Sequence, residues 1–280
     1  MINHIFFQLT TFTYLLSSIL YFFYTGIKRE GFGKAGSWIA LFGFAINTAA
    51  MVIRYFESHR LGIGYVPLSN MYESMVFMYE SMVFFAWSIV GLYLLLERFY
   101  RSRGLGAFIL PLGFLAMGVT MLSLSPEIRP LMPALQSSWL VYHVITSFFG
   151  YAAFAISFGV SLLYLFKKKN LTQNGLWPSH QILEVINYKA IVIGFLLFTV
   201  GIITGAIWAN YAWGTYWSWD PKETWSLITW IVYAILLHAK YTGRWAGRRM
   251  AYVSITGFVA VIFTYWGVNY LISGLHSYAS

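Results

Sequence analysis

Three histidines and one aromatic segment of this sequence carry the residue types that could hold a large ligand. The aromatic segment, residues 213–225, reads WGTYWSWDPKETW. His143 lies about five residues into an apolar stretch, His238 lies near the end of another, and His276 follows the last one. Ionisable residues in such stretches are costly and are by default candidates for function. Each histidine taken alone is equally compatible with a plain hydrogen-bonded core residue.

The tryptophans of this segment are denser than an aromatic belt requires. Six of the twelve tryptophans fall between positions 208 and 230. Three of them lie in or near apolar stretches, where a belt at the membrane interface explains them equally well: Trp208, Trp225 and Trp230. The other three crowd one short connection: Trp213, Trp217 and Trp219. Stacked rings on a connection suit a large, planar, apolar ligand.

The acids in the same segment have a structural explanation. Asp220 is a residue type preferred at the N-cap, Pro221 suits the first helical position, and Glu223 falls three residues after the cap. The sequence therefore predicts a capping box, and capping is the main role expected of both acids. The helix end carries a partial positive charge to which Lys222 adds, so it is also suited to a ligand carboxylate.

Two imidazoles beside an aromatic platform, with a cationic helix end nearby, predict a haem site. His143 and His276 would be the axial ligands, and Lys222 with the helix end would face the propionates. The remaining histidines are expected to be surface residues without a role: His4, His59 and His180.

The elements that position these residues are expected to be membrane-spanning helices. Of the 280 residues, 59% are hydrophobic and 10% are charged, against about 25% charged in soluble domains. A span needs roughly 20 apolar residues. Eight such stretches predict an all-α integral membrane protein with a single polytopic domain, residues 1–280; the spans are 5–27, 36–55, 71–96, 105–124, 138–166, 189–208, 223–241 and 250–273. The N-terminal run has no basic region or small-residue cleavage site, so it is expected to be the first span and not a signal peptide.

The basic residues predict the orientation. The segments 28–34, 97–104, 167–189 and 240–249 hold 14 of the 18 lysines and arginines. Because cytoplasmic loops carry the Lys/Arg excess, these segments are expected to face the cytoplasm, and 167–189 to be a linker with a short amphipathic surface helix. Both termini and the tryptophan-rich loop, about 209–222, are then expected on the outer side. The net charge of +9 reflects this topology, and nucleic acid is a poor explanation for it.

One segment is duplicated. MYESMVF occurs at 71–77 and again, unchanged, at 78–84. Asn70 and Glu73 are expected to form a capping pair for the helix that follows. The second copy places Glu80 two turns deeper, where an unpaired carboxylate would be expensive.

The order of these motifs resembles the CcsA/ResC family of cytochrome c biogenesis proteins. WGTYWSWDPKETW resembles its tryptophan-rich WWD signature, and LQSSWLVYHV (135–144) and SGLHSYAS (273–280) are similar to its two outer-histidine segments. VPLSNMYES (66–74) and ITWIVYAILLHAK (228–240) are similar to further recurrent segments. The resemblance extends from about residue 66 to the C-terminus, although the family is expected to carry one copy of MYESMVF.

The resemblance implies a function. Proteins of this family work with a second membrane protein, CcsB or ResB, to bring haem b from the cytoplasmic side to the outer face. There it is presented to the CXXCH motif of apocytochrome c for thioether formation, as the haem-handling subunit of a cytochrome c synthase.

The resemblance also assigns residue roles. His143 and His276 become outer axial ligands of the haem iron, and His238 becomes the membrane histidine on the entry route, paired with a histidine of the partner. The platform is then made of Trp213, Gly214, Trp217, Trp219 and Asp220.

Two other functions remain open from the sequence alone. A di-haem electron-transfer subunit of the b type would need histidine pairs on facing helices, and a membrane scaffold or transporter would need no aromatic platform.

The membrane expected is the bacterial plasma membrane, with the thylakoid membrane as the alternative. The sequence has no cysteine, so disulfides and thiolate metal sites within the chain are excluded.

Overall fold

The structure, a computed structural model, is built from helices. It describes residues 2–62, 78–128, 136–167 and 177–272, and no strand occurs within these ranges. The all-α fold expected from composition is therefore confirmed. The eight long helices are α1 (Ile2–Ile27), α2 (Glu30–Arg60), α3 (Met78–Tyr100), α4 (Gly106–Ser123), α5 (Ser138–Phe166), α6 (His180–Trp213), α7 (Pro221–Tyr241) and α8 (Arg248–Ile262). A π-helical turn (Phe263–Gly267) and the short α9 (Val268–Leu271) continue α8.

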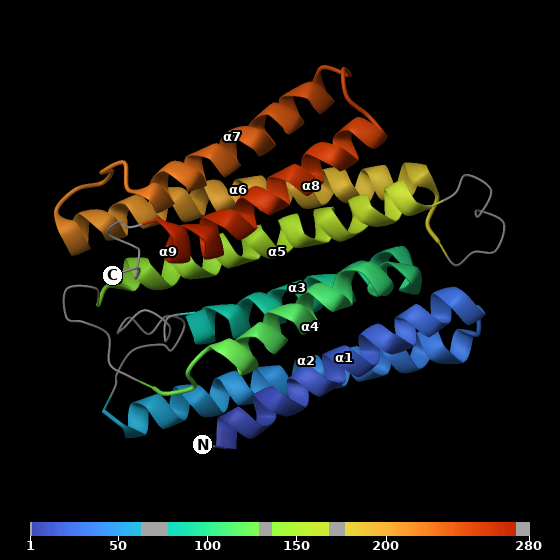
Figure 1. Cartoon of the computed structure of the whole chain (residues 1–280), viewed down its shortest axis with the longest axis horizontal. Helices are drawn as coiled ribbons and strands as arrows, with labels where there is room; N and C mark the ends of the chain where they lie inside the picture. Colours follow the sequence, from blue (N-terminus) through green and yellow to red (C-terminus); the bar gives the residue numbers. More distant parts are fainter. Residues whose placement is uncertain (1, 63–77, 129–135, 168–176, 273–280) are drawn as a thin grey trace.

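Seven segments of the described chain are long and apolar enough to cross a membrane, and they include every long helix except α7. The charged and polar residues Lys222, Glu223, His238 and Lys240 lower the hydropathy of α7. Its 21 residues still measure about 32 Å, which matches a hydrocarbon core of about 30 Å. In Figure 1, α7 runs beside α6 and α8 and is antiparallel to both, so it leads the chain from the end of α6 to the start of α8.

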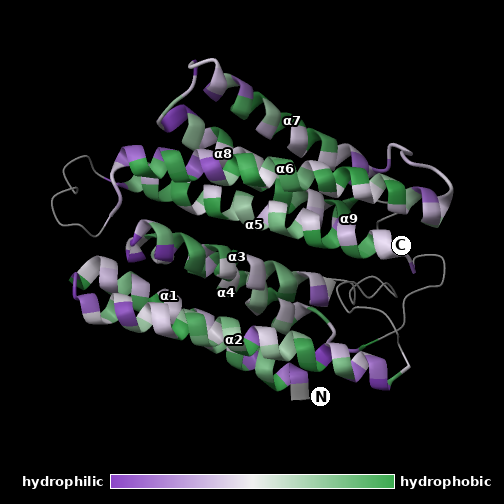
Figure 2. Cartoon of the chain, turned by 180° about the vertical axis from the view of Figure 1, so that it is seen from behind, coloured by the Kyte–Doolittle hydropathy of each residue, from purple (hydrophilic) through white to green (hydrophobic). Residues whose placement is uncertain are grey.

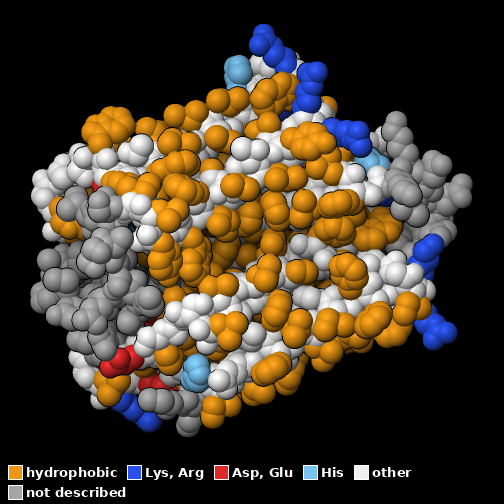
Figure 3. All heavy atoms as spheres, in the orientation of Figure 1, with side chains coloured by type: hydrophobic (Ala, Val, Ile, Leu, Met, Phe, Trp, Pro, Cys, Tyr) orange, Lys and Arg blue, Asp and Glu red, His pale blue; other side chains and the backbone are white. Residues whose placement is uncertain are grey.

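The helices form two groups that meet along α5 (Figure 1). In the first group α1 packs on α2 and α4, and α3 packs on α4; in the second, α6 and α8 pack on α5, and α7 packs on α8. Contacts of α3 and α4 with α5 join the groups. Figure 2 shows hydrophobic residues along the helices and hydrophilic ones gathered towards their ends, as expected for spans. The space-filling view is dominated by hydrophobic side chains, with Lys and Arg at its margins (Figure 3).

The basic segments gather at one end of the bundle. The turns between α1 and α2, α3 and α4, and α7 and α8 lie there, together with the end of α5 and the start of α6 (Figure 1). The N-terminus, the start of α5 and the connection between α6 and α7 lie at the opposite end. The helix order therefore separates the basic segments from the tryptophan-rich loop.

Both ends of α6 lie several residues beyond the expected span of 189–208. Residues 180–189, expected to belong to a surface helix of the linker, form the first turns of α6, and residues 168–176 lie outside the described part of the chain. Ser179 caps this helix by accepting a hydrogen bond from the backbone N–H of Ile182 at 3.2 Å, and a capped start lets one helix continue. At its other end α6 extends to Trp213 and stops at Gly214, whose φ of 77° is the left-handed C-cap conformation that favours glycine.

The expected cost of Glu80 is offset by an ion pair. Glu80 and Arg54 are both buried, with 2% of each side chain exposed. Nε of Arg54 donates to Oε1 of Glu80 at 2.8 Å, and Nη1 of Arg54 donates to the carbonyl of Pro126 at 3.0 Å. The second MYESMVF copy thus supplies the acid that pairs with a buried arginine of α2; the first copy, Asn70 and Glu73 lie outside the described residues.

Candidate functional site

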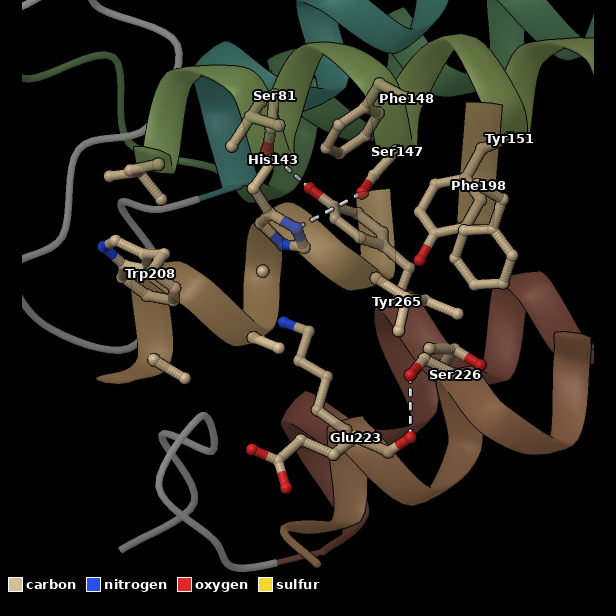
Figure 4. Close-up of a pocket in the computed structure, with 18 of the residues that line it drawn as sticks. Ser81, His143, Ser147, Phe148, Tyr151, Phe198, Trp208, Glu223, Ser226 and Tyr265 are labelled. Carbon is tan, nitrogen blue, oxygen red and sulfur yellow. Dashed lines mark hydrogen bonds between the residues drawn. The ribbon is translucent and has the colours of Figure 1, made fainter. Parts of the chain in front are cut away.

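A cavity of about 160 Å³ lies among α5, α6, α7 and the π-helical turn, with Ser81 of α3 also in its wall. Figure 4 shows His143, Ser147, Trp208, Glu223 and Tyr265 around it. The surface of the cavity is mostly apolar, and polar side chains from several helices reach it, which is the usual character of a small-molecule site. Its wall includes residues from the start of α5, the end of α6 and the start of α7, and these helix ends lie opposite the basic segments.

His143 enters the cavity from the second turn of α5. Ser137 caps this helix by accepting from the backbone N–H of Trp139 at 3.3 Å. Nδ1 of His143 lies 2.7 Å from the carbonyl oxygen of Gly201 on α6. A carbonyl only accepts hydrogen bonds, so Nδ1 carries the proton of the neutral ring and Nε2 carries its lone pair. Metal-binding histidines have the same tautomer, and they also donate a hydrogen bond from the ring nitrogen that does not bind the metal.

The rest of the His143 ring is fixed by α6. A Cβ added at Gly205 would lie 2.6 Å from Nδ1 of His143. Glycine, which has no side chain, therefore leaves room for the imidazole. Trp208 stacks parallel to the ring, with centroids 6.2 Å apart and an interplanar angle of 9°. Gly201, Gly205 and Trp208 are spaced by four and three residues, which places them on one helix face.

Lys222 brings a cation to the same cavity. Its Nζ donates to Oδ1 of Asn269 at 2.9 Å and lies 5.9 Å from the ring centroid of Tyr265. Tyr265 belongs to the π-helical turn, an irregularity that is frequent at functional sites, and its hydroxyl lies 2.6 Å from Oγ of Ser81. The lysine expected to contact propionates therefore shares the cavity with His143.

The capping box is confirmed. Asp220 accepts from the backbone N–H of Lys222 at 3.0 Å, and Glu223 accepts from the backbone N–H of Asp220 at 3.2 Å, with Pro221 in the first turn. Glu223 also accepts from the backbone N–H of Ser218 at 2.7 Å. Its carboxylate therefore caps α7 and fixes the course of the preceding loop.

The platform tryptophans occupy different positions. Trp217 lines the cavity. Trp213, the last residue of α6, packs edge-on against Trp208, with centroids 5.0 Å apart. Trp219 is 68% exposed and has a φ of 60°, which is rare for a residue other than glycine. Gly214 and Asp220 shape the two ends of the loop and are not among the residues that line the cavity.

The other two candidate histidines are not part of the described cavity. His238 is exposed on α7 and lies 16 residues after Lys222, which is roughly 24 Å along the helix. His276 lies outside the described residues. Of the histidines expected at the surface, His59 is exposed, whereas His4 and His180 are half-buried, His4 near the hydroxyl of Tyr79 and His180 against the ring of Tyr164.

Sequence reasoning assigned no role to the residues that hold His143. Gly205 carries no functional signal of its own in the sequence, and Trp208 is equally compatible with an aromatic belt. Their common helix face, together with Gly201, is visible in the sequence as a Gly-x₃-Gly-x₂-Trp spacing, but the spacing does not say which neighbouring helix it faces.

Comparison of the sequence with known proteins identifies the family of this chain. The profile of the family described as "Cytochrome C assembly protein" matches residues 75–276. The chain belongs to this family. The match covers α3 to α9 and includes His143, His238, His276 and the tryptophan-rich loop.

Named relatives agree with this family. The "Cytochrome c biogenesis protein CcsA" of Mesostigma viride is 38% identical over 88% of this chain and 86% of the relative. The protein of the same name from Prochlorococcus marinus (strain NATL2A) is 37% identical over 95% of this chain and 91% of the relative. Because family and relatives share one function, the chain acts in cytochrome c biogenesis, and its helices make it a multi-pass membrane protein.

The fold also occurs in a solved structure. "Cytochrome c Heme Lyase CcmF" superposes with a TM-score of 0.70 at 16% identity, covering 94% of this chain and 46% of that chain. At this identity the likeness concerns the fold. It shows that nearly the whole helix arrangement described above is found within a larger protein.

Proposed function

We propose that the chain binds haem at the His143 cavity and presents it to apocytochrome c. The observation that carries this proposal is the bond between Nδ1 of His143 and the carbonyl of Gly201 at 2.7 Å. It holds the imidazole in the tautomer whose Nε2 ligates iron, at the wall of a cavity that also contains Lys222 and Trp217.

The roles of the other residues follow from chemistry. Lys222 provides a positive charge for a propionate, and the N-terminus of α7 adds its partial charge. Trp217 offers a ring face to the porphyrin. His276 supplies the second axial ligand in this proposal, because it is the other histidine that the family resemblance places on the outer side.

The thioether chemistry requires thiols from elsewhere. Each thioether forms when a cysteine thiol adds across a haem vinyl group, so the sulfur binds carbon and the thiol proton is transferred to the other vinyl carbon. This chain contains no cysteine, so both thiols come from the CXXCH motif of the apocytochrome. The chain contributes haem binding, orientation and protection within a synthase complex.

The proposal includes a partner and a direction. A CcsB- or ResB-type membrane protein supplies the histidine that pairs with His238 at the cytoplasmic end, and haem b passes from there to the outer cavity. The membrane is the bacterial plasma membrane or a thylakoid membrane, and the loop between α6 and α7 faces the periplasm or lumen. The gathering of the basic segments at the opposite end supports this orientation.

The test of the site is His143→Gly with and without imidazole. We expect loss of low-spin haem and at least a tenfold fall in cytochrome maturation, because one axial ligand is removed. Added imidazole is small enough to occupy the space of the missing ring, so it should restore part of the low-spin spectrum and of the activity. Unchanged low-spin haem in the variant would show that the iron is ligated elsewhere.

The test of orientation is a set of reporter fusions. Fusions within 214–219 and after Ser280 should report the outer compartment, and one at Lys168 should report the cytoplasm. Opposite reports from 214–219 and Ser280 would place His143 and His276 on different sides and would contradict a shared haem.

A further inference from the structure

A second cavity, of about 630 Å³, opens at the basic end of the bundle between α2 and α3. The charged residues of its wall are four cations and one acid: Lys34, Arg98, Arg101, Arg103 and Glu97. Its other lining residues are Ser37, Trp38, Leu41 and Leu94. The cavity belongs to the N-terminal half of the chain, away from the haem cavity of α5–α7.

The acid in this wall is already engaged. Glu97 accepts hydrogen bonds from the hydroxyls of Tyr21 and Tyr93, each at 2.6 Å. Arg103 lies 3.5 Å from Glu97 and 2.9 Å from Glu30. Glu97 and Glu30 therefore neutralise the charge of Arg103, and they leave the other three cations of the wall without a neutralising acid.

Three cations of the wall are available to a ligand. Within the ranges that the structure describes, Lys34, Arg98 and Arg101 form no ion pair, and all three are exposed. Arg101 follows the last residue of α3 with a φ of 50°, in the left-handed region. Such a backbone is unfavourable for a residue with a Cβ, and here it turns the chain at the rim of the cavity.

The cavity changes from polar to apolar along the helices. Lys34, Trp38 and Leu41 are four and three residues apart and share one face of α2. Trp38 is 71% exposed and Leu41 is 46% exposed. On α3, Leu94 precedes Arg98 by one turn in the same way. Cations thus lie near the helix ends, with apolar side chains one to two turns deeper, of which Trp38 and Leu41 are exposed and Leu94 is half-buried.

We propose that this cavity binds the headgroup of an anionic phospholipid. The phosphate would lie among Lys34, Arg98 and Arg101, and the acyl chains along Trp38, Leu41 and Leu94. Basic pockets between membrane helices recognise anionic headgroups in this way, and arginine suits phosphate because it donates two parallel hydrogen bonds. The described wall contains no histidine or methionine that would ligate iron, so this site is distinct from haem binding.

The first experiment compares two variants that lose the same charge. Lys34→Gln/Arg98→Gln/Arg101→Gln removes the free cations of the cavity, whereas Arg244→Gln/Arg248→Gln/Arg249→Gln removes three exposed arginines near the turn between α7 and α8. Detergent-purified protein is titrated with phosphatidylglycerol, with phosphatidylcholine or with inorganic phosphate, and thermal unfolding and retained lipid by native mass spectrometry are measured.

For the wild type and the 244/248/249 variant, we expect phosphatidylglycerol to raise the midpoint of thermal unfolding by several degrees and to be retained in native mass spectra. The 34/98/101 variant should show neither effect. An equal response of the cavity variant would show general charge attraction and overturn the proposal. A response to inorganic phosphate as large as that to the lipid would assign the site to a free anion.

The second experiment needs no charge substitution. Phosphatidylglycerol brominated on its acyl chains should quench tryptophan fluorescence of the wild type more than brominated phosphatidylcholine does. Trp38→Phe should abolish this difference, because Trp38 is the tryptophan in the cavity wall. A difference that persists in Trp38→Phe would place the bound lipid elsewhere and contradict the proposal.

Discussion

His143 and His238 belong to opposite ends of the C-terminal half, and their surroundings differ. The carbonyl of Gly201, the absent side chain of Gly205 and the ring of Trp208 hold His143 within a cavity. His238 lies exposed on α7, and its side chain makes no hydrogen bond to the described residues. If both histidines ligate haem as proposed, His143 is oriented by its own chain, whereas the surroundings of His238 must come from a second protein. The comparison predicts that the two histidines fail differently.

The largest loss of haem is expected for His238→Ala in cells that also produce the proposed CcsB- or ResB-type partner. Haem recovered with the complex should fall at least tenfold, since delivery is interrupted before the outer cavity. The purified variant given haem directly should retain the low-spin spectrum of the wild type, because His143 and its supports are untouched.

The control for this prediction is Tyr241→Phe, a change at a residue that is 87% exposed at the same end of α7. It should leave haem recovery unchanged. If His238→Ala lost haem equally when haem is supplied directly, the two histidines would act at one site and the comparison would fail.

The support of His143 is tested by Gly205→Ala. A methyl group at this position would meet the imidazole at 2.6 Å, so the ring must turn away from Gly201. Changes behind a metal ligand reduce affinity about 10–100-fold, and we expect a loss of haem affinity in this range, with partial conversion to a high-spin spectrum.

Gly118→Ala is the matched control, because no atom lies within 4 Å of a Cβ added at Gly118 of α4. It should bind haem as the wild type does. Equal haem affinity of Gly205→Ala and Gly118→Ala, with both proteins folded, would mean that His143 is not held by α6.

The sequence predicted those parts of this site that are local. The capping box of Asp220 and Glu223 depends on four consecutive residues, and it formed as expected. The all-α fold followed from apolar stretches of sufficient length. Interactions between distant segments were not predictable: the pairing of Glu80 with Arg54 and the packing of Gly205 against His143 depend on how helices lie beside one another. A periodic pattern defines a helix face but does not identify the neighbour that the face meets.

The loop tryptophans should separate by position. Trp217 lines the cavity, so Trp217→Ala should weaken haem binding about tenfold, equivalent to about 1.4 kcal/mol, while membrane insertion remains intact. Trp219 is 68% exposed, and Trp219→Ala should have a smaller effect on haem affinity. Haem titration of both purified variants distinguishes them. A larger loss from Trp219→Ala would move the haem out of the cavity and onto the loop.

The smallest effect on haem is expected at the acids that cap α7. Asp220→Asn keeps a side chain suited to the N-cap, so the free energy of unfolding should change by no more than about 0.5 kcal/mol. Glu223→Ala removes the acceptor of the backbone N–H groups of Ser218 and Asp220 and should lower stability by about 1–2 kcal/mol. Thermal unfolding in detergent measures both, and haem titration of the folded variants should show less than a threefold change for Asp220→Asn. If Asp220→Asn lowered haem affinity as much as Trp217→Ala does, the carboxylate would act on the ligand and not only on the helix end, because the amide retains the capping geometry and loses only the charge.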